Sequence, residues 1–89
     1  MLIGLYALFT IFIFVNKDER KILIDFGKRL RNIRRSKDFT QEKLAFTIGV
    51  EISQISRIER GIINTSLLNL MKISTALQVP PQELFEPET

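Results

Sequence analysis

The feature that most constrains this chain is a pair of short helical patterns separated by one glycine, in the segment TQEKLAFTIGVEISQISRIERG at residues 40–61. Thr40 is a capping residue and acidic Glu42 lies in the first turn, which is how a helix begins. The first pattern stops at Gly49, where a residue with positive φ is needed, and the second stops at Gly61. Helices joined by so short a turn must cross steeply. The apolar positions are Leu44, Ala45, Ile48, Ile52, Ile55 and Ile58.

Two short helices crossed in this way have the geometry of a helix-turn-helix, whose second helix can enter the major groove of DNA. The charge distribution favours a polyanionic partner. The net charge is only +3, but residues 28–37 (KRLRNIRRSK) contain bases and no acid, while residues 83–89 contain acids and no base. This asymmetry suggests a polyanion on one side of the molecule, although a basic run is also typical of a solvated helix face.

The composition argues against catalysis. The chain has no cysteine and no histidine, which excludes disulfides, thiolate zinc sites, the usual general base and the commonest metal ligand. The acids are scattered, with no close pair on one predicted face. We therefore expect a protein that is not an enzyme and that holds no metal or cofactor. The absence of cysteine also fits a cytoplasmic location.

The periodicity predicts an all-α fold, because no segment of the body alternates like a strand. We expect an apolar head and charged junction at residues 1–21, followed by a compact five-helix bundle with the helix-turn-helix at residues 22–89. The first helix carries an apolar stripe that includes Phe26, the fourth begins near Thr65 or Ser66, and Pro81 opens a short fifth. The residues expected in the core are Leu30, Leu44, Ile55, Ile58, Leu70 and Leu77.

The head, MLIGLYALFTIFIFV at residues 1–15, has no charged side chain. It is shorter than the roughly 20 apolar residues that a membrane-spanning helix needs, and no basic segment precedes it as in a signal peptide. Its composition from Phe9 to Val15 equally suits a buried strand. Three interpretations stay open: an element packed on the body or across a dimer, a weak membrane anchor, or a product of upstream translation without a native role.

From about Phe26 to Phe85 the chain resembles the phage-repressor (Cro and XRE-type) helix-turn-helix DNA-binding family. The resemblance rests on TQEKLA, IGV and ISRIERG in order, followed by NTSLLNLMKISTALQVPPQELF in register. It covers about two thirds of the chain and leaves the head outside. It implies a five-helix bundle in which helix three, about residues 52–60, reads double-stranded DNA.

The resemblance also implies roles for individual residues. Arg57 is the strongest candidate for base readout, because arginine can donate two hydrogen bonds to guanine. Ile52 could touch a thymine methyl group or lie at the rim of the core. Glu51 stands where the family often has serine or threonine. The implied roles are base contact for Ile52, Ser53 and Arg57, phosphate or marginal contact for Gln41, Gln54, Ser56 and Asn64, and a structural ion pair for Arg34 and Glu59.

These features predict a sequence-specific DNA-binding transcriptional regulator, a repressor or autoregulator, acting as a homodimer. Two alternatives use the same scaffold. One is an antitoxin that binds its operator and also a partner toxin protein. The other is a membrane-tethered or purely protein-binding module, which would show weak DNA binding without sequence preference.

Overall fold

The computed structural model describes the backbone of residues 2–86, and the side chains of that range except those of residues 2, 3, 6 and 9–17. All the regular structure in this range is helical, so the all-α prediction is confirmed. The fifth element is a 3₁₀-helix rather than an α-helix. The elements are α1 (Leu2–Ser36), α2 (Gln41–Ile48), α3 (Ile52–Glu59), α4 (Leu67–Leu77) and the 3₁₀-helix η1 (Pro81–Phe85).

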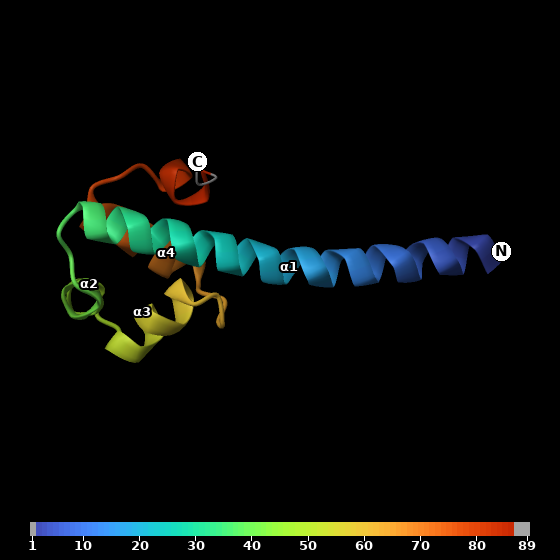
Figure 1. Cartoon of the computed structure of the whole chain (residues 1–89), viewed down its shortest axis with the longest axis horizontal. Helices are drawn as coiled ribbons and strands as arrows, with labels where there is room; N and C mark the ends of the chain where they lie inside the picture. Colours follow the sequence, from blue (N-terminus) through green and yellow to red (C-terminus); the bar gives the residue numbers. More distant parts are fainter. Residues whose placement is uncertain (1, 87–89) are drawn as a thin grey trace.

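The first helix is much longer than the sequence suggested. α1 begins at Leu2 and continues for 35 residues, through the charged junction and into the body. The alternative of a buried strand at Phe9–Val15 is therefore wrong. At 1.5 Å per residue such a helix is about 52 Å long, close to the 55 Å maximum extent of the molecule. Figure 1 shows its N-terminal half projecting alone from the bundle.

This projection sets the overall shape. A compact chain of this length has a radius of gyration of about 12 Å, whereas the observed value is 16.0 Å. The helix continues through the junction because lysine, arginine and glutamate are good helix formers and no proline interrupts it.

The ends of the shorter helices are fixed by local chemistry that the sequence predicted. The Thr40 side chain accepts a hydrogen bond of 3.0 Å from the Lys43 N–H, and Gly49 closes α2 with a φ of 77°. Ser66, one of the two expected caps, accepts a hydrogen bond of 3.0 Å from the Asn69 N–H at the start of α4. Of these capping residues, Gly49 begins the turn between α2 and α3.

All the elements contribute to the core: α2 packs on α3 and α4, α1 packs on α3 and η1, and η1 also contacts α4. Five of the six residues expected there are buried, while Leu70 is only partly buried and packs on the rim of the core. Ile52 is 47% exposed and is not part of the core. The fully buried side chains are Leu30, Leu44, Ile55, Ile73, Leu77 and Leu84.

Two glycines allow α1 and α3 to touch through their backbones. A Cβ atom on Gly27 would lie 2.5 Å from the carbonyl oxygens of Ile58 and Glu59. Gly61 has a φ of +72°, and a Cβ there would lie 2.7 Å from the Cα of Ile24. The C-terminal end of α3 is therefore held directly against α1, which fixes the direction of the helix.

Candidate nucleic-acid interface

The helix α3 buries one face and presents the other to solvent. Ile55, Ile58 and Glu59 are buried, and the residues expected to contact bases are among the exposed positions of the helix. All three of these, Ile52, Ser53 and Arg57, are exposed. Ser53 and Arg57 are four residues apart and therefore share one face of the helix, whereas Ile52 lies about 140° around the axis from Arg57. The two residues expected at the margin, Gln54 and Ser56, are partly buried.

The expected ion pair between Arg34 and Glu59 is present and buried. Arg34 Nε lies 2.6 Å from Glu59 Oε2 and Nη2 lies 3.0 Å from Oε1, so the contact is bidentate. Arg34 Nη1 also donates to the Phe39 carbonyl at 2.7 Å. Because a planar guanidinium matches a carboxylate in two places, this contact fixes orientation as well as distance. It joins α1 and the segment before α2 to the end of α3.

Gln41 belongs to the same network. Its side-chain amide donates to Glu59 Oε1 at 3.0 Å, and the residue is partly buried. The side chain is thus directed toward Glu59, while the residue remains the first of α2. Every buried side-chain nitrogen and oxygen among the described residues has a hydrogen-bond partner. The network is therefore a satisfied support that holds the N-terminal end of α2 beside α3.

The ends of α3 differ from those of α2 and α4. Glu51 is the N-cap of α3, but its side chain makes no capping hydrogen bond. The exposed residue Asn64, expected to contact phosphate, lies in the segment between α3 and α4. The N-cap position of α3 therefore carries a carboxylate, whereas a serine or threonine hydroxyl there would cap the helix. The carboxylate also adds a negative charge at this end of the helix.

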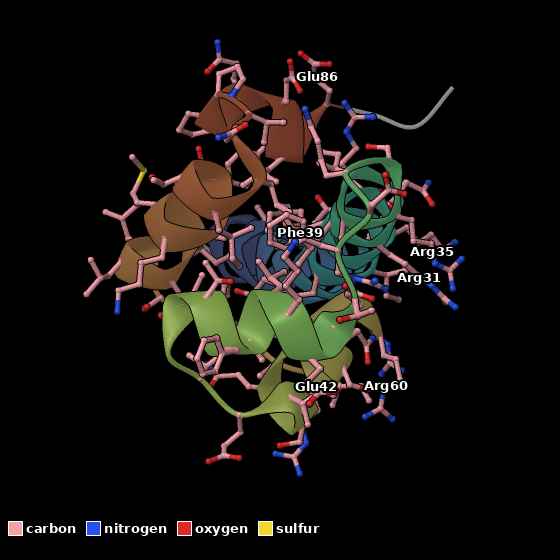
Figure 2. All side chains as sticks on the ribbon, turned by 90° about the vertical axis from the view of Figure 1, so that its left-hand side faces the viewer. Arg31, Arg35, Phe39, Glu42, Arg60 and Glu86 are labelled. Atoms are coloured by element: carbon pink, nitrogen blue, oxygen red, sulfur yellow. The ribbon has the colours of Figure 1, made fainter. Side chains whose placement is uncertain are left out.

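Three arginines project from one edge of the molecule. Arg31 and Arg35 project from α1, and Arg60, just after α3, projects from the same side in Figure 2. Sequence reasoning did not single out Arg60, because it lies outside the basic run, although its position at the end of the predicted reading helix was a signal. It also did not single out Gly27, whose role depends on the neighbouring helix.

Elsewhere, the carboxylate of Asp25 hydrogen-bonds to the exposed Lys21 ammonium and raises the pKa of that lysine. Because the shift raises the pKa of a lysine, Lys21 keeps its positive charge at neutral pH. Among the described residues no cluster of acids could hold a metal ion. Nor does the described part of the chain contain a helix with the length and apolarity needed to cross a membrane.

The geometry agrees with comparisons to known proteins. Residues 30–84 match the family model Helix-turn-helix, HTH_3. The chain belongs to this family. Control protein C.BamHI of Bacillus amyloliquefaciens is 50% identical over 62 residues, which cover 68% of this chain and 76% of that protein.

Two solved structures of helix-turn-helix proteins are also similar. The restriction-modification controller protein C.AhdI from Aeromonas hydrophila has a TM-score of 0.69 and 48% identity, covering 71% of this chain and 96% of that one. SinR, the master regulator for biofilm formation, was solved in complex with DNA and has a TM-score of 0.65 and 34% identity, covering 68% and 98%. The resemblance stated from the sequence is confirmed, and with it the assignment as a DNA-binding transcriptional regulator.

Proposed function

We propose that this protein binds inverted DNA half-sites as a homodimer and acts as a cytoplasmic repressor or autoregulator, with no catalytic activity and no cofactor. The observation that carries the proposal is the fixed, outward-facing surface of α3. Ser53 and Arg57 share this surface, and the exposed Ile52 lies at the N-terminal end of the helix. Behind it, the buried Arg34–Glu59 pair and the Gly27 contact hold the helix in one orientation.

Each of these side chains has a distinct chemistry toward DNA. Arg57 can donate two hydrogen bonds to O6 and N7 of guanine, worth about 1–3 kcal/mol of discrimination between bases. The exposed Ile52 suits contact with a thymine methyl group. Ser53 can bond to several bases and specifies little. The free N–H groups at the start of α2, where Gln41 lies, suit a phosphate.

A dimer follows from the length of the reading helix. α3 has 8 residues and is therefore about 12 Å long, which spans only a few base pairs. A second copy related by a two-fold axis doubles the contacts, and its half-site lies about 34–36 Å away. We therefore expect an operator with two inverted half-sites one helical turn apart.

The names of two relatives suggest which genes this protein regulates. One is a control protein and the other is a restriction-modification controller protein. By analogy, we propose that this chain controls a restriction-modification system, including its own gene. The test is a mobility-shift titration with the DNA upstream of its own gene and an equally long duplex from within that gene. The proposal expects at least about 10³-fold tighter binding upstream, and equal binding to both duplexes would contradict it.

Arg57 provides a test at the level of one residue. We expect Arg57→Ala to lose about 1–3 kcal/mol of preference for the operator and to retain most non-specific binding. Thr75→Ala on α4 is a control of an exposed residue on a helix outside the reading surface. An equal loss on operator and unrelated DNA would mean that Arg57 contacts phosphate only.

A further inference from the structure

We propose that Arg31, Arg35 and Arg60 form an auxiliary phosphate-binding surface, here called the arginine edge, that holds the DNA backbone beside the groove entered by α3. Two of the three residues belong to α1, outside the helix-turn-helix. The inference rests on the proposed function in taking DNA as the partner. It adds to that function a second, sequence-independent contact that neither the reading surface nor the N-terminal end of α2 supplies.

The packing of α1 on α3 places the arginine edge. Gly27 lies against the last carbonyl groups of α3, and Arg34 reaches Glu59. Arg31 lies four residues after Gly27 and three before Arg34, so it flanks the line of contact between the two helices. Arg35 is one turn further along, and Figure 2 shows both on the same side of the molecule as Arg60.

Two other arginines of α1, Arg29 and Arg34, are already engaged within the protein. Arg34 is buried in its pair with Glu59. Arg29 donates to the Glu83 carbonyl at 2.8 Å and lies 3.4 Å from the Glu86 carboxylate, which attaches it to η1. These two side chains hold the bundle together and have little capacity left for a ligand.

The arginine edge differs in that its charges are not neutralised. Arg31 and Arg35 are exposed, and no carboxylate among the described residues pairs with either. Arg60 makes one long hydrogen bond, 3.3 Å from Nε to the Ser56 carbonyl, which leaves its terminal N–H groups available. Three guanidinium groups on one edge, without acid partners, repel one another unless an anion lies between or beside them.

Phosphate is the anion that fits this edge. A guanidinium group presents a planar fork that binds two phosphate oxygens at once. The edge is on the side where the chain enters α2, whose N-terminal end also suits phosphate (Figure 2). Glu42, in the first turn of α2, is the acid labelled nearest to this edge in Figure 2. Its single negative charge is fewer than the three positive charges of the arginine edge. A DNA backbone that contacts the N-terminal end of α2 would therefore also contact the arginine edge.

The test is a salt titration of binding to a duplex of random sequence, from about 50 to 200 mM salt. We compare the wild type with Arg31→Gln, Arg35→Gln, Arg60→Gln and the double variant Arg31→Gln/Arg35→Gln. Each arginine that contacts phosphate should lower the slope of log K against log salt by about 1 per bound protomer, and the double variant by about 2. Thermal unfolding of each variant checks that the fold is intact.

Lys72→Gln is the matched control, because Lys72 is an exposed base on α4, whereas the arginine edge belongs to α1 and the residue after α3. If the arginine variants keep the wild-type slope, or change it no more than Lys72→Gln does, the arginine edge is refuted. This test can fail while the proposed function holds, and the proposed function can fail while this test succeeds. Loss of slope without any preferred sequence would support the edge and contradict the operator, and a preferred sequence with unchanged slopes would do the opposite.

Discussion

The same helix passes through two very different regions. In the body, from about residue 22 onward, α1 buries Leu30 completely and contacts α3 and η1. In the head, the described side chains of Leu5 and Leu8 are 66% and 65% exposed. Both regions contain large apolar residues and both are helical. They differ in whether other elements of the chain cover them, which shows that helix formation and burial are separate properties of a sequence.

The comparison also separates two sources of order. The head is helical through bonds along its own backbone, and such a helix is only marginally stable in water without packing. The body is ordered by contacts between elements far apart in sequence, such as Arg34 with Glu59 and Gly27 with the end of α3. We therefore expect substitutions to be costly in the body and nearly silent in the head.

The largest effect should come from breaking the buried ion pair. Glu59→Gln leaves the Arg34 guanidinium buried without a counter-charge, and we expect a loss of about 3–5 kcal/mol of unfolding free energy. Urea denaturation measures it. The matched control is Asp25→Asn, which breaks the exposed pair with Lys21 and should leave the midpoint unchanged. Similar losses in both variants would show that burial of an ion pair does not set its contribution to stability.

The next largest effect should come from a glycine of the body, compared with a glycine of the head. Gly27→Ala puts a methyl group into the backbone of α3, and we expect a loss of about 1–3 kcal/mol despite the better helix propensity of alanine. Gly4→Ala meets nothing within 4 Å, so it should leave the unfolding midpoint of the body unchanged. The measurement is the thermal unfolding midpoint of each variant, compared with that of the wild type. A stable Gly27→Ala protein would show that α1 and α3 are not in close backbone contact.

A smaller effect is expected at the start of the reading helix. Glu51→Ser supplies the capping hydrogen bond that α3 lacks, and we expect a gain of about 1 kcal/mol in unfolding free energy. It also removes a negative charge near the reading surface, so binding to DNA should tighten. Thr40→Ala is the counterpart, since it removes the existing cap of α2 and should destabilise by a similar amount. A destabilised Glu51→Ser variant would contradict this account of the cap.

The smallest effect should come from removing the head. A chain of residues 22–89 should unfold cooperatively at nearly the midpoint of the full chain and keep its affinity for DNA. Circular dichroism and sedimentation velocity measure stability and oligomeric state. Loss of the dimer in the shortened chain would show that the head forms the subunit interface, and loss of folding would show that residues 1–21 are not separable from the body.

Local features of the fold could be predicted from the sequence. The cap at Thr40, the positive φ of Gly49 and the helix opened by Pro81 each depend on a few neighbouring residues. The Arg34–Glu59 pair is not local, and its prediction depended on the family resemblance. Of the proposed base contacts, Ile52 could only be assigned to the surface once the fold was known.

Features that depend on distant contacts could not be predicted. Gly27 is unremarkable in a helical pattern, because its role comes from the backbone of α3. Gln41 sits at the start of α2, yet its side chain turns to Glu59, which no local rule indicates. Phe9–Val15 was ambiguous because a short apolar run does not distinguish a strand from a helix.

The central claim is that the body presents α3 as a sequence-specific reader to which a second copy contributes equally. The most direct test is selection of bound duplexes from a random DNA pool by the full-length protein near physiological salt. The account predicts a paired, inverted motif whose half-sites are about 34–36 Å apart from centre to centre. An unpaired motif would contradict the two-fold assembly, and no enrichment above background would contradict sequence-specific recognition itself.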